Sequence, residues 1–370
     1  MKLGMVYHQL VAAGGLENYL IEFSRRLSEA GHELTFVTSR INAEVAAKLK
    51  GEVKMLRRSK GSALLRLWQF SRDAASVVPT LGVDRVLGFG HTVRHDVHRA
   101  GGGCHAHYSE LLPFWKRYGM KNLLALHLER QLYTGGMTAH FVTNSNEVTG
   151  DLAGRYGVDA GRFTTIHTAV EGAVFRPAED QGAVREEVRR EMKTDLGAKV
   201  LLFVSLSHWR KGLDGILEAM VELPEAVLWV VGKGLNRAYL KRVEELGIGG
   251  RIRLVAVTKG LVRLYQAADW FVHPTRYDAC ANTVLQSMAC GLPGLISVHD
   301  GAVDHVCDGG TGFLLKQPED AGVLVKELKV ALSCDESERR RMGEAARTAV
   351  EGLTWERHVG QWEELLGNLP

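Results

Sequence analysis

Short apolar runs alternate with amphipathic stretches along the chain, a pattern typical of a parallel β-sheet covered by helices. In the first half, the runs predicted to be strands are residues 3–7, 34–38, 53–56, 85–88 and 140–143. Between the first two runs, residues 16–30 carry apolar side chains at helical spacing and end at Gly31. The first half therefore predicts an α/β domain.

The same alternation starts again in the second half, which indicates a second α/β domain in tandem. The predicted strands there are residues 200–205, 227–231, 252–257, 270–273 and 294–297. Helices fit between them at residues 212–222, 237–246, 261–268 and 282–290. Turn residues and charges replace the apolar pattern in "HTAVEGAVFRPAEDQGAVREE", so the two domains join within this segment.

Near the end, one apolar stripe predicts a packed helix; it consists of Trp355, Val359, Trp362 and Leu366. We therefore divide the chain into residues 1–170, residues 171–353 and a final helical segment, residues 354–370. A chain of 370 residues exceeds the size at which a single core stops growing, which agrees with two domains.

Composition narrows the class of protein. Hydrophobic residues make up 45% and charged residues 24%, as in an ordinary globular enzyme, and a net charge of +3 does not indicate a nucleic-acid partner. No stretch approaches the roughly 18 apolar residues of a membrane-spanning helix. The segment "MKLGMVYHQLVAAGGLENYL" fits a first strand better than a signal peptide. Five cysteines without a C-x-x-C pair favour reduced thiols in a cytoplasmic protein.

Gly14 and Gly15 follow the first predicted strand and precede a helix. Backbone N–H groups and the helix dipole favour an anion at such a place, although a tight turn explains the pair equally well. The dinucleotide fingerprint G-x-G-x-x-G is absent here, which argues against an NAD-dependent oxidoreductase. A second glycine segment, "VVGKGLNR", is weak evidence by itself.

Arg210 and Lys211 fall between a predicted strand and the helix after it. In an open α/β sheet, ligands bind at the carboxyl ends of the strands. Two adjacent cations there suit a diphosphate, with Arg as a fork and Lys as a point charge. The alternative is a basic turn that faces solvent.

The segment "TRYDACANTVLQSMACGLP" places Asp278 in a loop and Gln286 in the helix that follows. We expect this helix to start near Ala281, with Asn282 as its N-cap. The N–H groups of Asn282 and Thr283 are then free for phosphate oxygens. The spacing fits a nucleotide sugar, with Asp278 near the sugar hydroxyls and Gln286 near the ribose.

The segments "HWRKGLD", "VVGKG", "AADWFVHPTRYDACANTVLQSMACGLP" and "GAVDHVCDGGTGFLL" resemble the C-terminal domain of the retaining GT-B glycosyltransferases of family 4. The segment "GFGHTVRHDVHRAGGGCHAHYSELL" is more narrowly similar to the lipopolysaccharide core glucosyltransferases of that family. The resemblance covers nearly the whole chain. It implies two Rossmann-like, doubly wound domains that face each other across a cleft, with the C-terminal helix crossing back to the N-terminal domain.

The family carries two glutamates with the spacing E-x7-E, where this chain has Asp278 and Gln286. The resemblance implies that Asp278 contacts the donor sugar with one methylene less of reach. It also implies that Gln286 accepts hydrogen bonds from the ribose without a charge, which weakens the contact. Main-chain atoms around Val257 and Thr258 are the expected contacts of the nucleotide base.

Asp96 matches a family acid near the cleft, and we expect it in a loop, either orienting a substrate or in a structural role. The family retains the anomeric configuration without a clear protein nucleophile, and the leaving phosphate is the implied base. A D-x-D metal motif is missing from the sequence, so neither a metal ion nor another cofactor is expected.

Residues 105–136 mix aromatic and basic side chains, which suits the surface of an anionic membrane or an ordinary packed helix. The resemblance favours peripheral contact with the inner membrane, on the side where a lipid-linked acceptor is found.

The sequence thus predicts transfer of a hexose, glucose from UDP-glucose, to a lipopolysaccharide core or related glycan. Four alternatives remain: transfer from another nucleotide sugar (GlcNAc or mannose), a nucleotide-sugar 2-epimerase, an α-glucan synthase, and a non-catalytic sugar-nucleotide binder, the last motivated by Gln286.

Overall fold

The computed structural model describes residues 1–11, 15–258 and 260–369 of the chain. It divides into two compact units, Met1–Thr168 with Trp355–Pro370 (unit 1) and Ala169–Thr354 (unit 2). The expected boundaries, after residues 170 and 353, fall next to these limits. No described helix is long and apolar enough to cross a membrane.

Unit 1 is built on a parallel sheet of seven strands in the order β3-β2-β1-β4-β5-β6-β7. The strands are β1 (Lys2–Val6), β2 (Glu33–Thr38), β3 (Glu52–Met55), β4 (Arg85–Phe89), β5 (His95–Arg99), β6 (Thr138–Thr143) and β7 (Phe163–Thr165). All five strands predicted in the first half are present. The strands β5 and β7 were not predicted.

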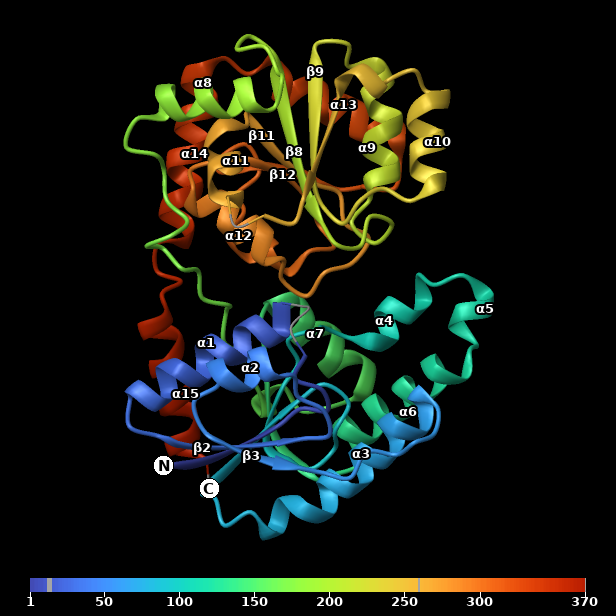
Figure 1. Ribbon diagram of the computed structural model, residues 1–370, viewed down its shortest axis with the longest axis vertical. Coiled ribbons are helices and arrows are strands. Elements are labelled where there is room, and N and C mark those ends of the chain that lie inside the picture. The colour runs from blue at the N-terminus through green and yellow to red at the C-terminus, as the bar shows by residue number, and fades with distance from the viewer. Residues whose placement is uncertain (12–14, 259, 370) are drawn as a thin grey trace. The chain divides into compact units, whose positions relative to one another are not determined.

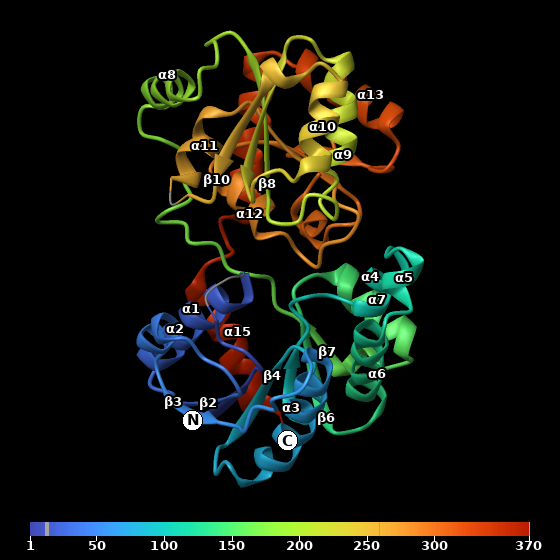
Figure 2. The ribbon, with the colours of Figure 1, turned by 45° about the vertical axis from the view of Figure 1, so that its right-hand side comes forward.

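Helices lie on both sides of the unit 1 sheet (Figures 1 and 2). They are α1 (Gly15–Glu29), α2 (Ala43–Lys48), α3 (Ala63–Val77), α4 (His105–Glu110), α5 (Phe114–Arg117), α6 (Met120–Thr134), α7 (Asn146–Tyr156) and α15 (Trp355–Asn368). The last helix packs on α1, because Tyr19 Oη lies 2.8 Å from His358 Nε2 and the rings of Phe23 and Trp362 are 5.4 Å apart. The predicted apolar stripe of α15 is buried, as expected.

Unit 2 repeats the architecture with a parallel sheet of six strands in the order β10-β9-β8-β11-β12-β13. The strands are β8 (Lys199–Ser205), β9 (Ala226–Gly232), β10 (Ile252–Ala256), β11 (Trp270–His273), β12 (Gly294–Ser297) and β13 (Gly312–Leu315). The helices are α8 (Gln181–Glu191), α9 (Leu213–Ala219), α10 (Arg237–Glu245), α11 (Leu261–Ala267), α12 (Asn282–Ala289), α13 (Ala321–Ser333) and α14 (Glu336–Val350). The predicted helix 212–222 is shorter than expected, because its last residues form a 3₁₀ turn, Met220–Glu222.

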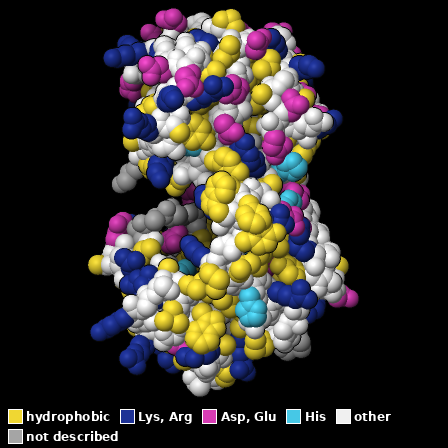
Figure 3. All heavy atoms as spheres, turned by 90° about the vertical axis from the view of Figure 1, so that its right-hand side faces the viewer, with side chains coloured by type: hydrophobic (Ala, Val, Ile, Leu, Met, Phe, Trp, Pro, Cys, Tyr) yellow, Lys and Arg dark blue, Asp and Glu magenta, His cyan; other side chains and the backbone are white. Residues whose placement is uncertain are grey.

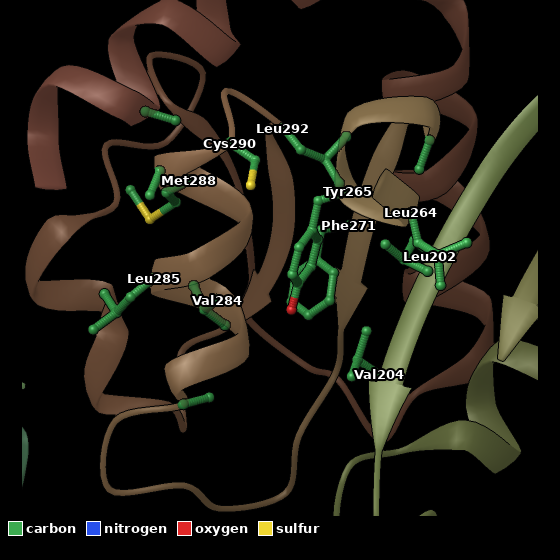
Figure 4. Packing of buried hydrophobic residues seen from close by; sticks show 14 of the residues in the cluster. Leu202, Val204, Leu264, Tyr265, Phe271, Val284, Leu285, Met288, Cys290 and Leu292 are labelled. Atoms are coloured by element: carbon green, nitrogen blue, oxygen red, sulfur yellow. The ribbon is translucent and has the colours of Figure 1, made fainter. Parts of the chain in front are cut away.

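Two buried clusters cover the two faces of the unit 2 sheet. One joins the sheet to α8, α11, α12 and α14; Leu202, Phe271 and Val284 belong to it (Figure 4). The other joins the sheet to α9 and α13, through residues such as Ile216 and Leu328. Strands buried on both faces explain why β8 and β9 read as continuous apolar runs.

The strand order reverses once in each sheet, between β1 and β4 in unit 1 and between β8 and β11 in unit 2. In doubly wound folds, this switch point at the carboxyl ends of the strands is where ligands bind. The segments that follow β1, β4, β8 and β11 are therefore the places to look for chemistry.

Candidate active site

The turn between β8 and α9 carries Arg210 and Lys211 at the switch point of unit 2. Gly212, which follows them, has a φ of +78°, a left-handed conformation that glycine adopts without strain. A β-carbon at this position would collide with the carbonyl oxygen of Pro274, just beyond β11. The glycine therefore lets the turn after β8 lie against the loop after β11, which carries Asp278.

The side chain of Asp278 contacts both cations. Its Oδ2 atom accepts a hydrogen bond from Arg210 Nη1 at 2.7 Å and pairs with Lys211 Nζ. Arg210 Nη1 also donates to the carbonyl oxygen of Tyr277 at 2.9 Å, and Arg276 N donates to the carbonyl oxygen of Arg210 at 2.8 Å. Three residues that the sequence analysis assigned to the donor site thus meet in one cluster.

Two buried residues that the sequence analysis did not single out, His273 and Asp300, complete this cluster. Lys211 Nζ lies 2.9 Å from His273 Nε2, which in turn lies 3.2 Å from Asp300 Oδ2. Asp300 Oδ1 accepts a hydrogen bond from Ala281 N at 3.0 Å. Their position in the sequence could have indicated them: His273 ends β11 and Asp300 closely follows β12, so both lie at the carboxyl end of a strand.

Burial and charge together set the protonation of the cluster. Burial alone would raise the pKa of Asp278, but the charges of Lys211 and Arg210 outweigh it and hold this pKa well below its usual value. Burial lowers the pKa of Lys211, and the attraction of Asp278 opposes that shift. The pKa of His273 is lowered by burial and then by the charge of Lys211. The result is an ionised carboxylate beside basic groups, a set that suits sugar hydroxyls and phosphate oxygens.

The helix after this loop, α12, has Ala281 as its N-cap and Asn282 as its first helical residue. The expected N-cap at Asn282 is therefore wrong by one residue. The physical reason is Asp300, whose distant carboxylate binds Ala281 N and fixes the start of the helix. Among the described residues, no acceptor binds the N–H groups of Asn282 and Thr283, which leaves them for an anion.

Gln286 lies one turn into α12 and is half-buried. Its Oε1 atom accepts a long hydrogen bond, 3.5 Å, from the hydroxyl group of Tyr265. Tyr265 is buried, and its ring packs against Phe271 with the centroids 5.8 Å apart (Figure 4). The core thus orients the amide of Gln286, and its contact with a ribose stays a prediction.

Among the described residues, one group of three potential metal ligands has its ligand atoms within 4.8 Å of one another: His273, Asp278 and Asp300. Lys211 Nζ contacts two of them, His273 Nε2 and Asp278 Oδ2. An ammonium group at this place supplies positive charge and repels a second cation. Operation without a metal ion stays a prediction.

The other residues predicted to bind the donor lie outside this cluster. Val257 and Thr258 follow β10, the edge strand of the unit 2 sheet, and both are exposed. Gly15 is the exposed first residue of α1 in unit 1. Gly14 falls outside the described residues. The contacts of these residues with a nucleotide stay predictions.

Asp96 lies in strand β5 and not in a loop, contrary to the sequence analysis. It is the second residue of the strand, so it lies at the amino end of the sheet, away from the edge where ligands bind in such folds. Its Oδ2 atom accepts a hydrogen bond from Val86 N of β4 at 2.6 Å. This contact completes the pairing of two strands, which is a structural role.

Two family models match the chain, Glycosyltransferase Family 4 over residues 13–172 and Glycosyl transferases group 1 over residues 184–349. Together they span the unit 2 sheet and six of the seven strands of the unit 1 sheet, β2–β7. The fold is that of the crystal structure of WaaG, a glycosyltransferase involved in lipopolysaccharide biosynthesis, with a TM-score of 0.83, 20% identity and coverage of 99% of this chain and 100% of that one. The chain belongs to the GT-B glycosyltransferases.

Curated relatives of this glycosyltransferase carry different names. Lipopolysaccharide glucosyltransferase WaaG of Escherichia coli K12 is 25% identical over 256 residues, which cover 68% of each chain. D-inositol 3-phosphate glycosyltransferase of Corynebacterium efficiens is 28% identical over 225 residues, and the match spans about half of that relative, 52%. The structure of Anabaena Alr3699/HepE in complex with UDP-glucose has a TM-score of 0.77 and 15% identity, with full coverage of both chains.

The family membership makes the protein an enzyme of the hexosyltransferase class and assigns it a nucleotide-sugar donor and a glycan acceptor. It rules out the oxidoreductase weighed from the sequence. The cluster of Arg210, Lys211 and Asp278 lies within the residues that the group 1 model matches.

Proposed function

We propose that this glycosyltransferase moves glucose from UDP-glucose, with retention of configuration, to a hydroxyl group of a lipopolysaccharide core or related glycan. The observation that carries the proposal is the meeting of Arg210, Lys211 and Asp278 at the switch point of unit 2. The choice of donor and acceptor is supported by the names of WaaG, a lipopolysaccharide glucosyltransferase, and of the HepE complex with UDP-glucose.

In the proposed reaction, the bond between C1 of the donor sugar and the diphosphate oxygen breaks. A bond between C1 and the acceptor oxygen forms on the same face, and the hydroxyl proton passes to the leaving diphosphate. Arg210 and Lys211 stabilise the negative charge that develops on the diphosphate. The diphosphate competes with Asp278 for the two cations, which frees carboxylate oxygens of Asp278 for the sugar hydroxyls.

The same cluster supports a reaction without a metal ion. Lys211 Nζ lies among the three potential ligands and takes the place of a divalent cation as the positive charge. Turnover should persist after treatment with EDTA and should not rise when magnesium or manganese is added.

Transfer to an inositol phosphate is the second candidate, and the names of several relatives favour it. The alignments with most of those relatives span about half of their length, so the acceptor is open to direct test.

The exposed surface of α5 and the start of α6 supports peripheral binding to an anionic membrane on its cytoplasmic side. Phe114 and Trp115 are 75% and 74% exposed, and Tyr118 and Met120 are exposed beside them. Figure 3 shows apolar side chains gathered on the face of unit 1 that carries α4–α6, with basic side chains among them. Aromatic and basic groups side by side bind headgroups and the acyl boundary. Co-sedimentation with phosphatidylglycerol vesicles that is unaffected by Trp115→Ser would contradict this contact.

Incubation with radiolabelled UDP-glucose, with and without a truncated core acceptor, tests the main proposal. We expect acceptor-dependent transfer and an α-linked product, because the donor is α-configured. Parallel reactions use UDP-GlcNAc, GDP-mannose and inositol phosphate. Faster turnover with another nucleotide sugar, or with inositol phosphate as acceptor, would replace the corresponding part of the proposal.

A further inference from the structure

The switch point of unit 1 brings two histidines together. β1 and β4 pair in parallel with Val6 opposite Gly88, so the segments that follow them lie side by side. His8 follows the end of β1 by two residues and His91 follows the end of β4 by two residues. The two turns lie close together, because a β-carbon at Gly90 would lie 3.3 Å from Tyr7 Cε2.

His105 and Lys121 extend this pair. The rings of His91 and His105 meet edge to face with their centroids 5.6 Å apart. His105 Nε2 lies 2.8 Å from Asn122 Oδ1, and the amide nitrogen of Asn122 donates to Ser109 Oγ at 2.6 Å. The Asn122 amide is therefore oriented with its oxygen toward His105, whose Nε2 donates.

Lys121 precedes Asn122 in α6, and its charge acts on both histidines of the switch point. Burial and then the charge of Lys121 lower the pKa of His8. Burial, His105, His8 and Lys121, in that order, lower the pKa of His91 to about 4. The paired turns and the ring contact thus bring His8, His91 and His105 together, and the exposed Lys121 is the chain neighbour of Asn122, the partner of His105.

Among the described residues, no carboxylate forms an ion pair with the side chains of His8, His91, His105 or Lys121. Two acids of adjacent segments have other partners. Glu17 accepts a hydrogen bond from Tyr7 Oη at 3.3 Å, and Glu129 binds His105 N at 2.6 Å and Tyr156 Oη at 2.6 Å.

The cluster is built for an anion and not for a metal ion. Its ring nitrogens do not converge, since the one described group with ligand atoms within 4.8 Å of one another lies in unit 2. The side chains of His8 and His91 are half-buried, and solvent reaches their ring nitrogens. Imidazole N–H groups and an ammonium group together match the oxygens of an oxyanion.

We propose that His8, His91, His105 and Lys121 form a subsite for an oxyanion, a phosphate monoester or a carboxylate, carried by the acceptor. The inference rests on the proposed function: with the donor at the switch point of unit 2, we place the acceptor on unit 1. The subsite would select anionic acceptors over neutral sugars and hold them by a group remote from the reacting hydroxyl.

Nuclear magnetic resonance of the histidine imidazoles in the full chain tests the subsite without turnover. Titration with inorganic phosphate should shift the signals of His8, His91 and His105 along one saturable curve. Lys121→Ala should weaken binding by about fivefold, the loss of one charge-assisted hydrogen bond, and Lys121→Arg should restore most of it. Glucose 6-phosphate should compete with phosphate, and glucose should not.

The controls are His127→Asn, an exposed histidine on the same helix α6, and Lys50→Ala, an exposed lysine in unit 1. Neither should change phosphate binding. Shifts that survive Lys121→Ala unchanged, or signals that respond to phosphatidylglycerol vesicles but not to phosphate, would overturn the proposal. Glucose transfer from UDP-glucose is measured separately, so a failed activity assay with intact phosphate binding counts against the proposed function alone.

Discussion

Asp278 and Asp300 lie side by side in a short parallel bridge between the loops that follow β11 and β12. Asp278 N donates to the carbonyl oxygen of His299 at 2.9 Å, and Gly301 N donates to the carbonyl oxygen of Asp278 at 3.0 Å. Asp300 also binds Ala281 N through Oδ1. One buried acid therefore positions both the carboxylate that contacts Arg210 and Lys211 and the start of α12.

Replacement of Asp300 tests this positioning role. In Asp300→Ala, Ala281 N loses its acceptor, and we expect the KM for UDP-glucose to rise about tenfold, the effect of one lost hydrogen bond to a charged group. Asp300→Asn keeps an oxygen for Ala281 N but loses the charge beside His273, so it should rescue most of the KM. Steady-state kinetics with both variants measure the difference. Equal KM values for Asp300→Ala and the wild type would show that the loop holds its shape without this acid.

Lys211→Met and Arg210→Ala test the stabilisation of the leaving diphosphate. Each should lower kcat by about 30- to 1000-fold, or about 2–4 kcal/mol of barrier, because the charge on the diphosphate grows in the transition state. The matched controls are Lys326→Met and Arg190→Ala, which change exposed side chains of unit 2. Single-turnover rates with bound UDP-glucose measure the chemical step. Near-wild-type rates in both site variants would show that Arg210 and Lys211 do not bind the diphosphate.

Gln286→Glu tests the contact with the ribose. A carboxylate accepts stronger hydrogen bonds than an amide, so the KM for UDP-glucose should fall about threefold to fivefold, or turnover should rise. The hydroxyl group of Tyr265 can donate to either side chain. Tyr265→Phe therefore separates the effect of the core hydroxyl from that of the ribose. Unchanged or worse kinetics in Gln286→Glu would argue against a ribose at this position.

The sequence predicts the elements that follow the apolar pattern and misses those that break it. Strand β5 has the sequence HDVHR, which does not read as a buried parallel strand. Its polar side chains have partners in other elements: His95 Nδ1 lies 3.3 Å from Thr138 Oγ1, Asp96 binds Val86 N, and the Arg99 guanidinium stacks on the ring of Tyr19. Such tertiary partners cannot be read from local periodicity.

The candidate site could likewise be predicted only in part. Arg210, Lys211 and Asp278 follow strands that the pattern identifies, so the rule for parallel sheets was enough to bring them together. His273 and Asp300 were missed because one ends an apolar run and the other lies in a loop without a recognised motif. The N-cap of α12 was misplaced for a related reason, since a carboxylate from another loop fixes the helix start and no local signal reports it.

Asp96→Ala distinguishes the structural role of Asp96 from the role in orienting a substrate that the sequence also allowed. Loss of the hydrogen bond to Val86 N leaves a strand amide without its acceptor and should cost about 1–3 kcal/mol of stability. The folded enzyme should keep its kcat and KM. Urea unfolding and steady-state kinetics over a range of donor concentrations measure the two effects. A fall in kcat with unchanged stability would show that Asp96 acts on a substrate and has no structural role.

Unit 1 should lose stability in mild acid because several of its histidines are buried in the neutral form. Burial lowers the pKa of His95 and of His358 to about 3, far below the ordinary histidine value of about 6.5. Between pH 6.5 and pH 3, both histidines are protonated in the unfolded chain and neutral in the folded chain. The free energy of unfolding therefore falls as the pH drops from 6.5 toward 3, by about 1.4 kcal/mol per pH unit for each such histidine.

Unit 2 should lose less stability over the same pH range: burial lowers the pKa of His273 there, whereas unit 1 contains both His95 and His358. Asp269 of unit 2 acts only at lower pH. Burial would raise the pKa of Asp269, but the charges of Arg189, Arg185 and Arg339 lower it. Its contribution to stability is fully present above the unfolded pKa of about 3.9 and is lost as the pH falls through the lower folded value. Hydrogen exchange followed peptide by peptide should therefore show α1 and α15 losing protection at a higher pH than β8.

The histidine argument has a direct control. His95→Gln removes one titrating group and should reduce the pH slope of unit 1 by about 1.4 kcal/mol per pH unit, even if the variant is less stable at pH 7. The exposed His127→Gln should leave the slope unchanged. An identical slope for the wild type and His95→Gln would mean that His95 becomes protonated without unfolding, because water reaches it between Thr92 and Thr138, which lie beside its two ring nitrogens.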